Sequence, residues 1–146
     1  MLKTALREKL QNIISLAKGW DQNFFSLRTL AINTAEPYIR GVLTIVETPI
    51  FSKLVYDYLT DDEFAEFQVF LAENPEAGDV VPRSGGVRKI RWARRGMGKS
   101  GGVRVIYFNR LSDSEIWLLA IYAKAKQENA PAHILRAMKE VIENER

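Results

Sequence analysis

The chain has 146 residues, of which 47% are hydrophobic and 27% charged, which is typical of one soluble globular domain with a sizeable core. It contains no cysteine and a single histidine, His133, which excludes disulfides, thiolate nucleophiles, cysteine-based zinc sites and sites built from two histidines. No apolar run approaches the roughly 20 residues of a transmembrane helix. Charges are spread through the N-terminus, unlike a secretory signal, so we expect a cytoplasmic protein without a membrane partner.

The first 42 residues predict a helical N-terminal extension. Apolar residues recur at spacings of three and four in residues 2–18. A second apolar cluster runs from Trp20 to Ile32, as in a short helix, and Glu36-Pro37 ends it. The extension carries six basic and three acidic residues, whereas the rest of the chain carries 15 of each, so the extension supplies the whole net charge of +3. We therefore divide the chain into an extension (1–42) and a domain (43–146).

The domain begins with a β-branched strand at residues 42–47, and two helices follow it. Thr48 is the predicted N-cap of the first helix, Pro49 is its first residue, and the helix runs to about Leu59. Residues 60–63 form a capping box for the second helix, which ends at Asn74-Pro75. Because the two helices are adjacent in the chain, we expect a helical hairpin.

Three strands and a helix complete the predicted fold. Apolar residues alternate in residues 87–93 and 103–108, which predicts two strands joined by a basic, glycine-rich loop. Residues 115–124 are almost wholly apolar, which predicts a strand buried on both faces, and residues 132–144 predict the last helix. The short connections favour an antiparallel meander with helices packed on one face, an α+β fold.

The positive charge of the domain is concentrated in the central hairpin. No Asp or Glu interrupts a run of nine basic residues: Arg83, Arg88, Lys89, Arg91, Arg94, Arg95, Lys99, Arg104 and Arg110. A basic patch on a sheet indicates a phosphate-bearing partner such as nucleic acid. The alternative is a solvated edge strand whose cations prevent aggregation.

The domain resembles the RelE/ParE superfamily of toxins from type II toxin–antitoxin modules, and most closely the HigB-like RelE toxins. The resemblance runs from about Thr44 to Arg146, about 70% of the chain, and the segments that carry it are VETPIF (46–51), NPEAGD (74–79), GGVRKIRW (85–92), GMGKSGGVRVIY (96–107) and IYAK (121–124). The resemblance implies a small curved antiparallel sheet with an N-terminal helical hairpin and a C-terminal helix. It also implies cleavage of messenger RNA on the ribosome, without a metal or cofactor, and inhibition of translation.

The resemblance further implies a partner, a cognate antitoxin of the HigA-like helix-turn-helix type. Operator DNA would be contacted only through this antitoxin. By position in the matching segments, Lys89, Arg91, Arg104 and Lys124 take the places of functional basic residues of the family. Ala125 stands where the RelE pattern has an arginine, and no tyrosine follows Tyr122. Tyr122, Lys99 or Lys126 would substitute, or the catalysis is reorganised.

The implied reaction is attack of a ribose 2′-hydroxyl on the adjacent phosphate. Arg91 and Arg104 suit stabilisation of the phosphoryl charge, because guanidinium groups contact phosphate in a bidentate way. Lys89 or Lys124 is the candidate general base, because neighbouring cations favour the neutral amine. We expect Arg94 and Arg95, and with them Lys99 and Lys126, to contact RNA.

Several aromatic and basic side chains have a structural alternative. Trp92 and Tyr107 alternate away from Arg91 and Arg104, which favours core positions over base stacking. Tyr122 fits either role. Arg88 shares the face of Trp92 and is either structural or contacts a partner, including RNA. His133 is expected to be a helix-start residue.

Two other functions fit the same fold. A ParE-like toxin would act on DNA gyrase without cleaving RNA, and a degenerate toxin would only bind RNA or antitoxin. Lys89, Arg91 and Arg104 favour the ribonuclease, because ParE-like chains generally lack the basic pair. The extension is either a mis-set start, with Val42 or Leu43 as the true beginning, or a genuine helical segment.

Overall fold

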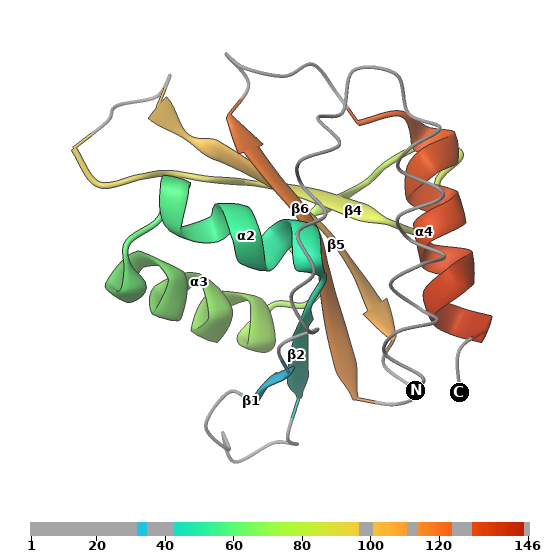
Figure 1. Cartoon of the computed structure of the whole chain (residues 1–146), viewed down its shortest axis with the longest axis horizontal. Coiled ribbons are helices and arrows are strands. Elements are labelled where there is room, and N and C mark those ends of the chain that lie inside the picture. Colours follow the sequence, from blue (N-terminus) through green and yellow to red (C-terminus); the bar gives the residue numbers. More distant parts are fainter. Residues whose placement is uncertain (1–31, 35–42, 97–100, 111–113, 124–129, 145–146) are drawn as a thin grey trace.

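Figure 1 shows the computed structural model of the chain, an α+β fold in which helices cover both faces of a mixed sheet. The structure describes residues 32–34, 43–96, 101–110, 114–123 and 130–144. Within these residues, the strands are β1 (Ile32–Thr34), β2 (Thr44–Glu47), β3 (Asp79–Val80), β4 (Arg88–Trp92), β5 (Val103–Arg110) and β6 (Glu115–Ala123). The helices are α2 (Pro49–Tyr58), α3 (Asp61–Glu73) and α4 (Ala132–Asn144).

The sheet has the strand order β1-β2-β6-β5-β4-β3. The predicted antiparallel meander of β4, β5 and β6 is confirmed. The prediction of a fully antiparallel sheet is wrong, because β2 pairs parallel to β6, with Ile45 opposite Ile116. Between these two strands the chain passes through both helices and three strands, and such a long crossover allows parallel pairing.

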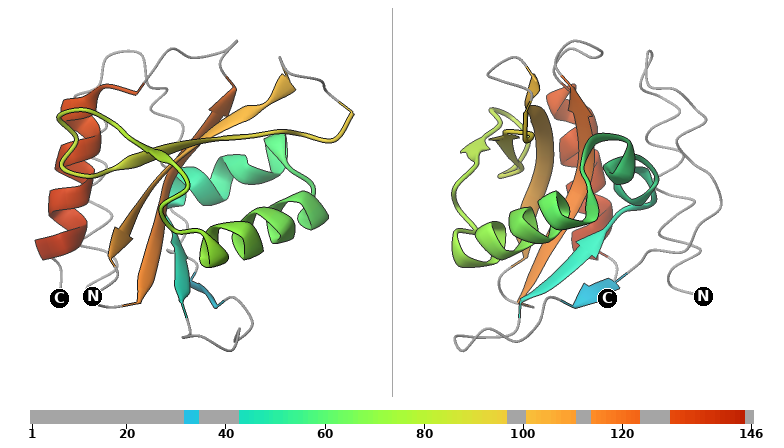
Figure 2. Two further views of the ribbon diagram at one scale, coloured as in Figure 1. Left: turned by 180° about the vertical axis from the view of Figure 1, so that it is seen from behind. Right: turned by 90° about the vertical axis from the view of Figure 1, so that its left-hand side faces the viewer.

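The two faces of the sheet carry separate cores (Figure 2). Ile116, Leu118 and Ile121 of β6 pack with α2 and α3 on what we call the hairpin face. Trp117 and Tyr122 pack with α4 on what we call the α4 face. Burial of β6 on both sides is confirmed, and it explains why the prediction of helices on one face is wrong: both apolar faces of the strand need cover.

The helices begin where the sequence predicts. Thr48 caps α2 and accepts a hydrogen bond from the Phe51 N–H, with Pro49 in the first turn. Thr60 and Glu63 form both hydrogen bonds of the capping box of α3. The predicted helical hairpin and the final helix are therefore confirmed.

The extension is not helical where the structure describes it. Strand β1 pairs antiparallel to β2, with Ile32 opposite Val46, so the expected helix at Ile32 is wrong. Without β1, the outer edge of β2 would leave backbone groups unpaired, and β-branched residues such as Ile32 and Thr34 suit an extended chain. The helix predicted over residues 2–18 lies outside the described residues.

A β-bulge in β6 changes which way its side chains face. Ile106 lies opposite Ala120 while Tyr107 lies opposite Leu118, so Leu119 is an extra residue in β6. Residues Leu119 and Ala120 both belong to the core of the α4 face, and the alternation restarts from there. Tyr122 consequently faces α4, whereas unbroken alternation with Leu118 would turn it toward the hairpin face.

The bulge is held from the start of α2. The buried Thr48 hydroxyl donates a 2.7 Å hydrogen bond to the Leu119 carbonyl, and the Thr48 N–H donates to the Leu118 carbonyl at 3.0 Å. The same Thr48 oxygen caps the helix. One side chain therefore fixes both the entry to α2 and the backbone at the bulge.

We expect Thr48→Val to lower the free energy of unfolding by about 1–3 kcal/mol, because it removes a helix cap and leaves the buried Leu119 carbonyl without this donor. Thr48→Ser keeps the hydroxyl and is the control. Urea denaturation followed by circular dichroism measures both. Equal stability of the valine and serine variants would contradict the assigned role of the hydroxyl.

Candidate functional site

Three of the predicted site residues form a line across the α4 face. Arg91 of β4 lies opposite Arg104 of β5, and Arg104 lies opposite Tyr122 of β6. Directly opposite residues of antiparallel strands have Cβ atoms about 4.5–5.5 Å apart on the same face. We call these three residues the lateral row. Two guanidinium groups and a phenol are thus positioned by neighbouring strands, without any contribution from a loop.

Lys89 lies one step from the lateral row on the same face. It is two residues before Arg91 on β4, about 7 Å away along the strand, and opposite Ile106. A cleft of about 240 Å³ opens beside it, between the sheet and the start of α4. The described residues that line this cleft include Lys89, Arg83, Ile106, Tyr122, Ala130, Ala132 and Leu135. Lys89 and Tyr122 therefore face one cleft.

Tyr122 combines core packing with a free hydroxyl. Its side chain is 4% exposed and packs in the core of the α4 face. Its buried hydroxyl has no hydrogen-bond partner among the described residues. Burial raises the pKa of this phenol above its ordinary value, and the nearby Ala130 N–H and Arg104 guanidinium oppose that rise less strongly. The Ala130 N–H lies near the phenol oxygen without the geometry of a hydrogen bond. At neutral pH the phenol is protonated and can donate.

Gly102 leaves the space that the Arg91 side chain occupies. A methyl group on Gly102 would lie 3.4 Å from Nε and 3.6 Å from Cγ of Arg91, and 3.1 Å from the Trp92 carbonyl oxygen. Gly102 is buried at the start of β5, next to the strand pair that carries Arg91 and Arg104. The sequence shows Gly102 as one of several glycines that allow close backbone approach, but not that Arg91 is what approaches it.

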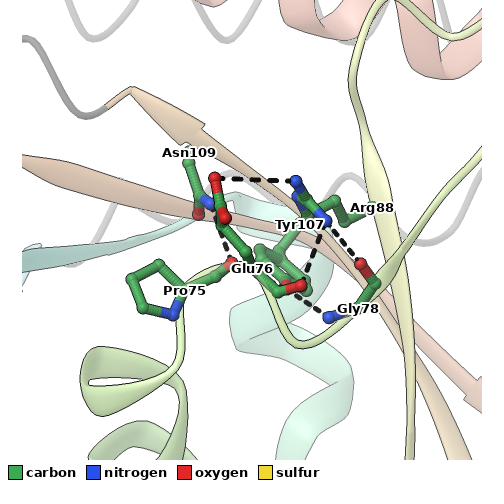
Figure 3. A network of polar contacts seen from close by, with 6 residues as sticks. All are labelled: Pro75, Glu76, Gly78, Arg88, Tyr107 and Asn109. Carbon is green, nitrogen blue, oxygen red and sulfur yellow. Dashed lines mark hydrogen bonds and ion pairs between the residues drawn. The ribbon is translucent and has the colours of Figure 1, made fainter.

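Arg88 lies in a polar network on the other side of β4 (Figure 3). Its guanidinium donates to the carbonyls of Gly78 at 2.7 Å and Glu76 at 3.1 Å, and lies 3.9 Å from the Glu76 carboxylate. The buried Tyr107 hydroxyl accepts from the Gly78 N–H and donates to the Pro75 carbonyl. This network ties the loop after α3 to β4 and β5. Arg88 is therefore not part of the lateral row. Its contacts are those of a residue that holds a loop in place, which agrees with the structural role given above as an alternative.

The two arginines after β4 are engaged with the helical hairpin and the loop. The Arg94 Nε donates to the Gly101 carbonyl, and its guanidinium lies 6.0 Å from the centre of the Tyr58 ring. Arg95 forms an ion pair with Glu66, and its backbone N–H donates to Glu63 at 2.9 Å. Lys99, Lys124 and Lys126 lie outside the described residues. The structure thus separates Arg94 and Arg95 from the lateral row.

Trp92 and Tyr107 occupy the core positions that the sequence favours. Trp92 packs against Phe67 and Phe70 with ring centres 5.2 Å apart, and Tyr107 is fully buried, so both core assignments are confirmed. His133 is exposed in the first turn of α4. Sequence reasoning did not identify Arg83 or the start of α4 as cleft residues. The Pro82-Arg83 turn, with Arg83 at φ 63°, gave no local signal of its place beside Lys89.

No protein-family model matches the sequence. Among the described residues, no group of three or more His, Asp or Glu side chains is placed to hold a metal ion. None of the described helices is both long and apolar enough to cross a membrane.

Glu63 should make the stability of the fold depend on pH. The Thr60 N–H, and then the Arg95 N–H, lower the pKa of this carboxyl below its ordinary 4.5. Its stabilising effect is therefore complete above about pH 4.5 and is lost as the pH falls through the lower, folded-state pKa. We expect Glu63→Gln to lower the free energy of unfolding at pH 7. Between pH 5 and 3, the free energy of unfolding should fall less in this variant than in the wild type.

Urea unfolding at several pH values measures this effect. Glu66→Gln is the control, because the Glu66 carboxylate is half-exposed and pairs only at the surface. An unchanged pH dependence in Glu63→Gln would contradict the assignment.

Gly102→Ala should move Arg91. The new methyl group would be tight against the Trp92 carbonyl oxygen at 3.1 Å and in contact with Arg91 Nε at 3.4 Å, so relief of the first contact shifts the backbone that carries the Arg91 side chain. We expect a shifted Arg91 Nε–Hε resonance in ¹H–¹⁵N spectra of a folded protein. The Arg136 Nε–Hε resonance in the same spectrum is the internal control, because Arg136 pairs with Glu140 on α4. An unmoved Arg91 resonance in a folded Gly102→Ala protein would show that the Arg91 side chain does not depend on the space left by Gly102.

Proposed function

We propose that the chain is the toxin of a type II toxin–antitoxin module, of the HigB-like RelE kind, and that it cleaves messenger RNA on the ribosome. Support comes from the lateral row together with Lys89. Two arginines that the resemblance marks as functional lie opposite each other on one face, with a lysine one step along the strand. The lateral row is the single observation that favours an RNA-cleaving site over a solvated edge strand.

The lateral row suits stabilisation of a phosphate that gains negative charge. In the proposed reaction, the 2′-oxygen forms a bond to phosphorus and the bond from phosphorus to the 5′-oxygen breaks. The products are a 2′,3′-cyclic phosphate and a 5′-hydroxyl. Arg91 and Arg104 would contact the non-bridging oxygens, which carry the developing charge.

Two proton transfers complete this reaction. Lys89, or Lys124 beyond the described strand, would accept the proton of the 2′-hydroxyl. The Tyr122 phenol, which burial keeps protonated, would donate a proton toward the leaving 5′-oxygen rather than act as a base. Its position opposite Arg104 brings this donor beside the guanidinium groups.

The proposal includes the partners that the resemblance implies. The ribosome would present the messenger RNA, and a HigA-like helix-turn-helix antitoxin would neutralise the toxin and carry it to operator DNA. The basic face of the central hairpin is compatible with ribosomal RNA, whose phosphates attract such surfaces. Arg94 and Arg95 would take part only by exchanging their present contacts with the loop and α3 for RNA.

We expect Arg91→Ala and Arg104→Ala each to lower the rate of messenger RNA cleavage by roughly 10²–10³, by analogy with the loss of one charge-stabilising donor. The full chain is added to a ribosomal translation extract, and new 5′ ends on the messenger RNA are counted. Arg136→Ala is the charge-matched control, because Arg136 is exposed on α4 and pairs with Glu140 of the same helix. We expect it to cleave like the wild type.

Arrested growth of cells that express the chain, without new 5′ ends on their messenger RNA, would contradict the proposed nuclease activity. Inhibition of gyrase supercoiling would then indicate the ParE-like alternative. RNA binding without cleavage in the wild type would instead indicate a degenerate toxin.

A further inference from the structure

The cleft beside the lateral row has aliphatic walls and a further cation, Arg83, that the cleavage step does not use. Its volume of about 240 Å³ exceeds the roughly 150 Å³ of a cavity that accepts one benzene ring, so a single flat ring system fits. Ile106 lines it from the sheet, and Ala132 and Leu135 line it from α4. Aliphatic surfaces on both sides favour a planar group with apolar ring faces.

The polar groups of the cleft are mainly hydrogen-bond donors. Lys89 and Arg83 carry only donors, and the Tyr122 phenol has an O–H without a partner among the described residues. No acidic side chain is among the described residues that line the cleft. A group that enters it should therefore present acceptors. The buried phenol also points to a ligand, because a buried hydroxyl without a partner is costly and an acceptor that reached it would remove this cost.

Among the nucleobases, guanine fits this set of donors best. Its N7 and O6 form a pair of adjacent acceptors, and a lysine or arginine donating to them is a common specific contact. Adenine replaces one of these acceptors with a donor, cytosine presents an amino donor, and uracil has the single acceptor O4 on this edge. Single-stranded RNA is commonly recognised through bases splayed out of the stack and bound at such edges.

The cleft also lies at a suitable distance from the phosphate site. Lys89 is about 7 Å from Arg91 along β4, and Tyr122 belongs both to the lateral row and to the cleft. A base in the cleft and a phosphate on Arg91 and Arg104 can thus belong to the same or to adjacent nucleotides.

We infer that the cleft binds a single guanine base of RNA beside the phosphate held by Arg91 and Arg104. The RNA setting rests on the proposed function, but the cleft, its donors and its aliphatic walls do not. The pocket would make cleavage depend on the sequence next to the cut.

The test measures binding of free nucleotides to the full chain by calorimetry. Guanosine 3′-monophosphate is compared with the adenosine, cytidine and uridine 3′-monophosphates at one salt concentration. We expect guanosine to bind about tenfold more tightly, because two good contacts to one base edge contribute about 1–3 kcal/mol of discrimination. Equal affinity for all four nucleotides would overturn the inference, since charge alone would then explain the binding.

Two substitutions on α4 locate the binding. Ala132→Leu fills the cleft and should reduce guanosine binding to the level of the other nucleotides. Ala137→Leu makes the same change on the same helix at a residue that is not among those lining the cleft, and should leave the preference intact. A preference that survives Ala132→Leu would place the base elsewhere and overturn the inference.

A third variant avoids dependence on the packing of α4. Tyr122→Phe keeps the ring in the core but removes the free hydroxyl, so the preference for guanosine should fall several-fold in a folded protein. An unchanged preference in Tyr122→Phe, together with an unchanged one in Ala132→Leu, would exclude the cleft as the site.

Mapping of cleavage sites separates the two proposals. Guanosine preference in calorimetry without any RNA cleavage would support the pocket and contradict the nuclease. Cleavage without enrichment of guanosine at a fixed position from the cut, in wild type and in Ala132→Leu alike, would support the nuclease and contradict the pocket.

Discussion

The hydrogen bond from the Thr48 hydroxyl to the Leu119 carbonyl is the contact on which the rest of the arrangement depends. It stabilises the bulge in β6 at the point where the strand gains one residue. Because the bulge reverses the alternation, Tyr122 faces α4 and lies opposite Arg104. A helix cap near the beginning of the domain thus determines the composition of the candidate site.

The two faces of the sheet differ in how they are covered and in what they carry. The hairpin face is closed by α2 and α3, which pack on apolar residues and on Trp92, and it holds the polar network around Arg88 at its margin. On the α4 face, among the residues that the structure describes, α4 covers one end and the cleft opens beside Lys89. Basic residues on opposite faces of β4 therefore have different roles: Arg88 holds a loop, and Arg91 faces the candidate site.

Local signals predicted much of this fold. The Thr48-Pro49 start, the capping box at Thr60 and the alternation around Arg91 each depend on neighbours in the chain, and each was recovered from the sequence. The parallel pairing of β2 with β6 was not, because it joins segments about 70 residues apart and no short pattern encodes it. The placement of helices on both faces of the sheet was also not predicted from short patterns. The apolar residues on both faces of β6 nevertheless indicate that each face needs to be covered.

The candidate site shows the same division. Strand alternation predicted which residues share a face with Arg91 and with Arg104 on their own strands, and the resemblance marked both arginines, but their opposite positions follow only from the register of β4 and β5. Tyr122 remained ambiguous between core and site because its face depends on the bulge, which no residue type announces. Arg83 and the start of α4 reach the cleft only through tertiary packing, and the fit of Arg91 over Gly102 depends on distances of a few ångströms.

The dual position of Leu135 couples the cleft to the local stability of α4. Leu135 is fully buried in the core and also lines the cleft, and its neighbours Ile134 and Met138 anchor the same helix. The cleft can widen at this wall only if the first turns of α4 lift from the sheet and expose part of the core. Access for a large occupant is thus tied to a sub-global opening of the kind that amide hydrogen exchange detects. An occupant that fits without such opening would bind only the closed helix and would slow that exchange.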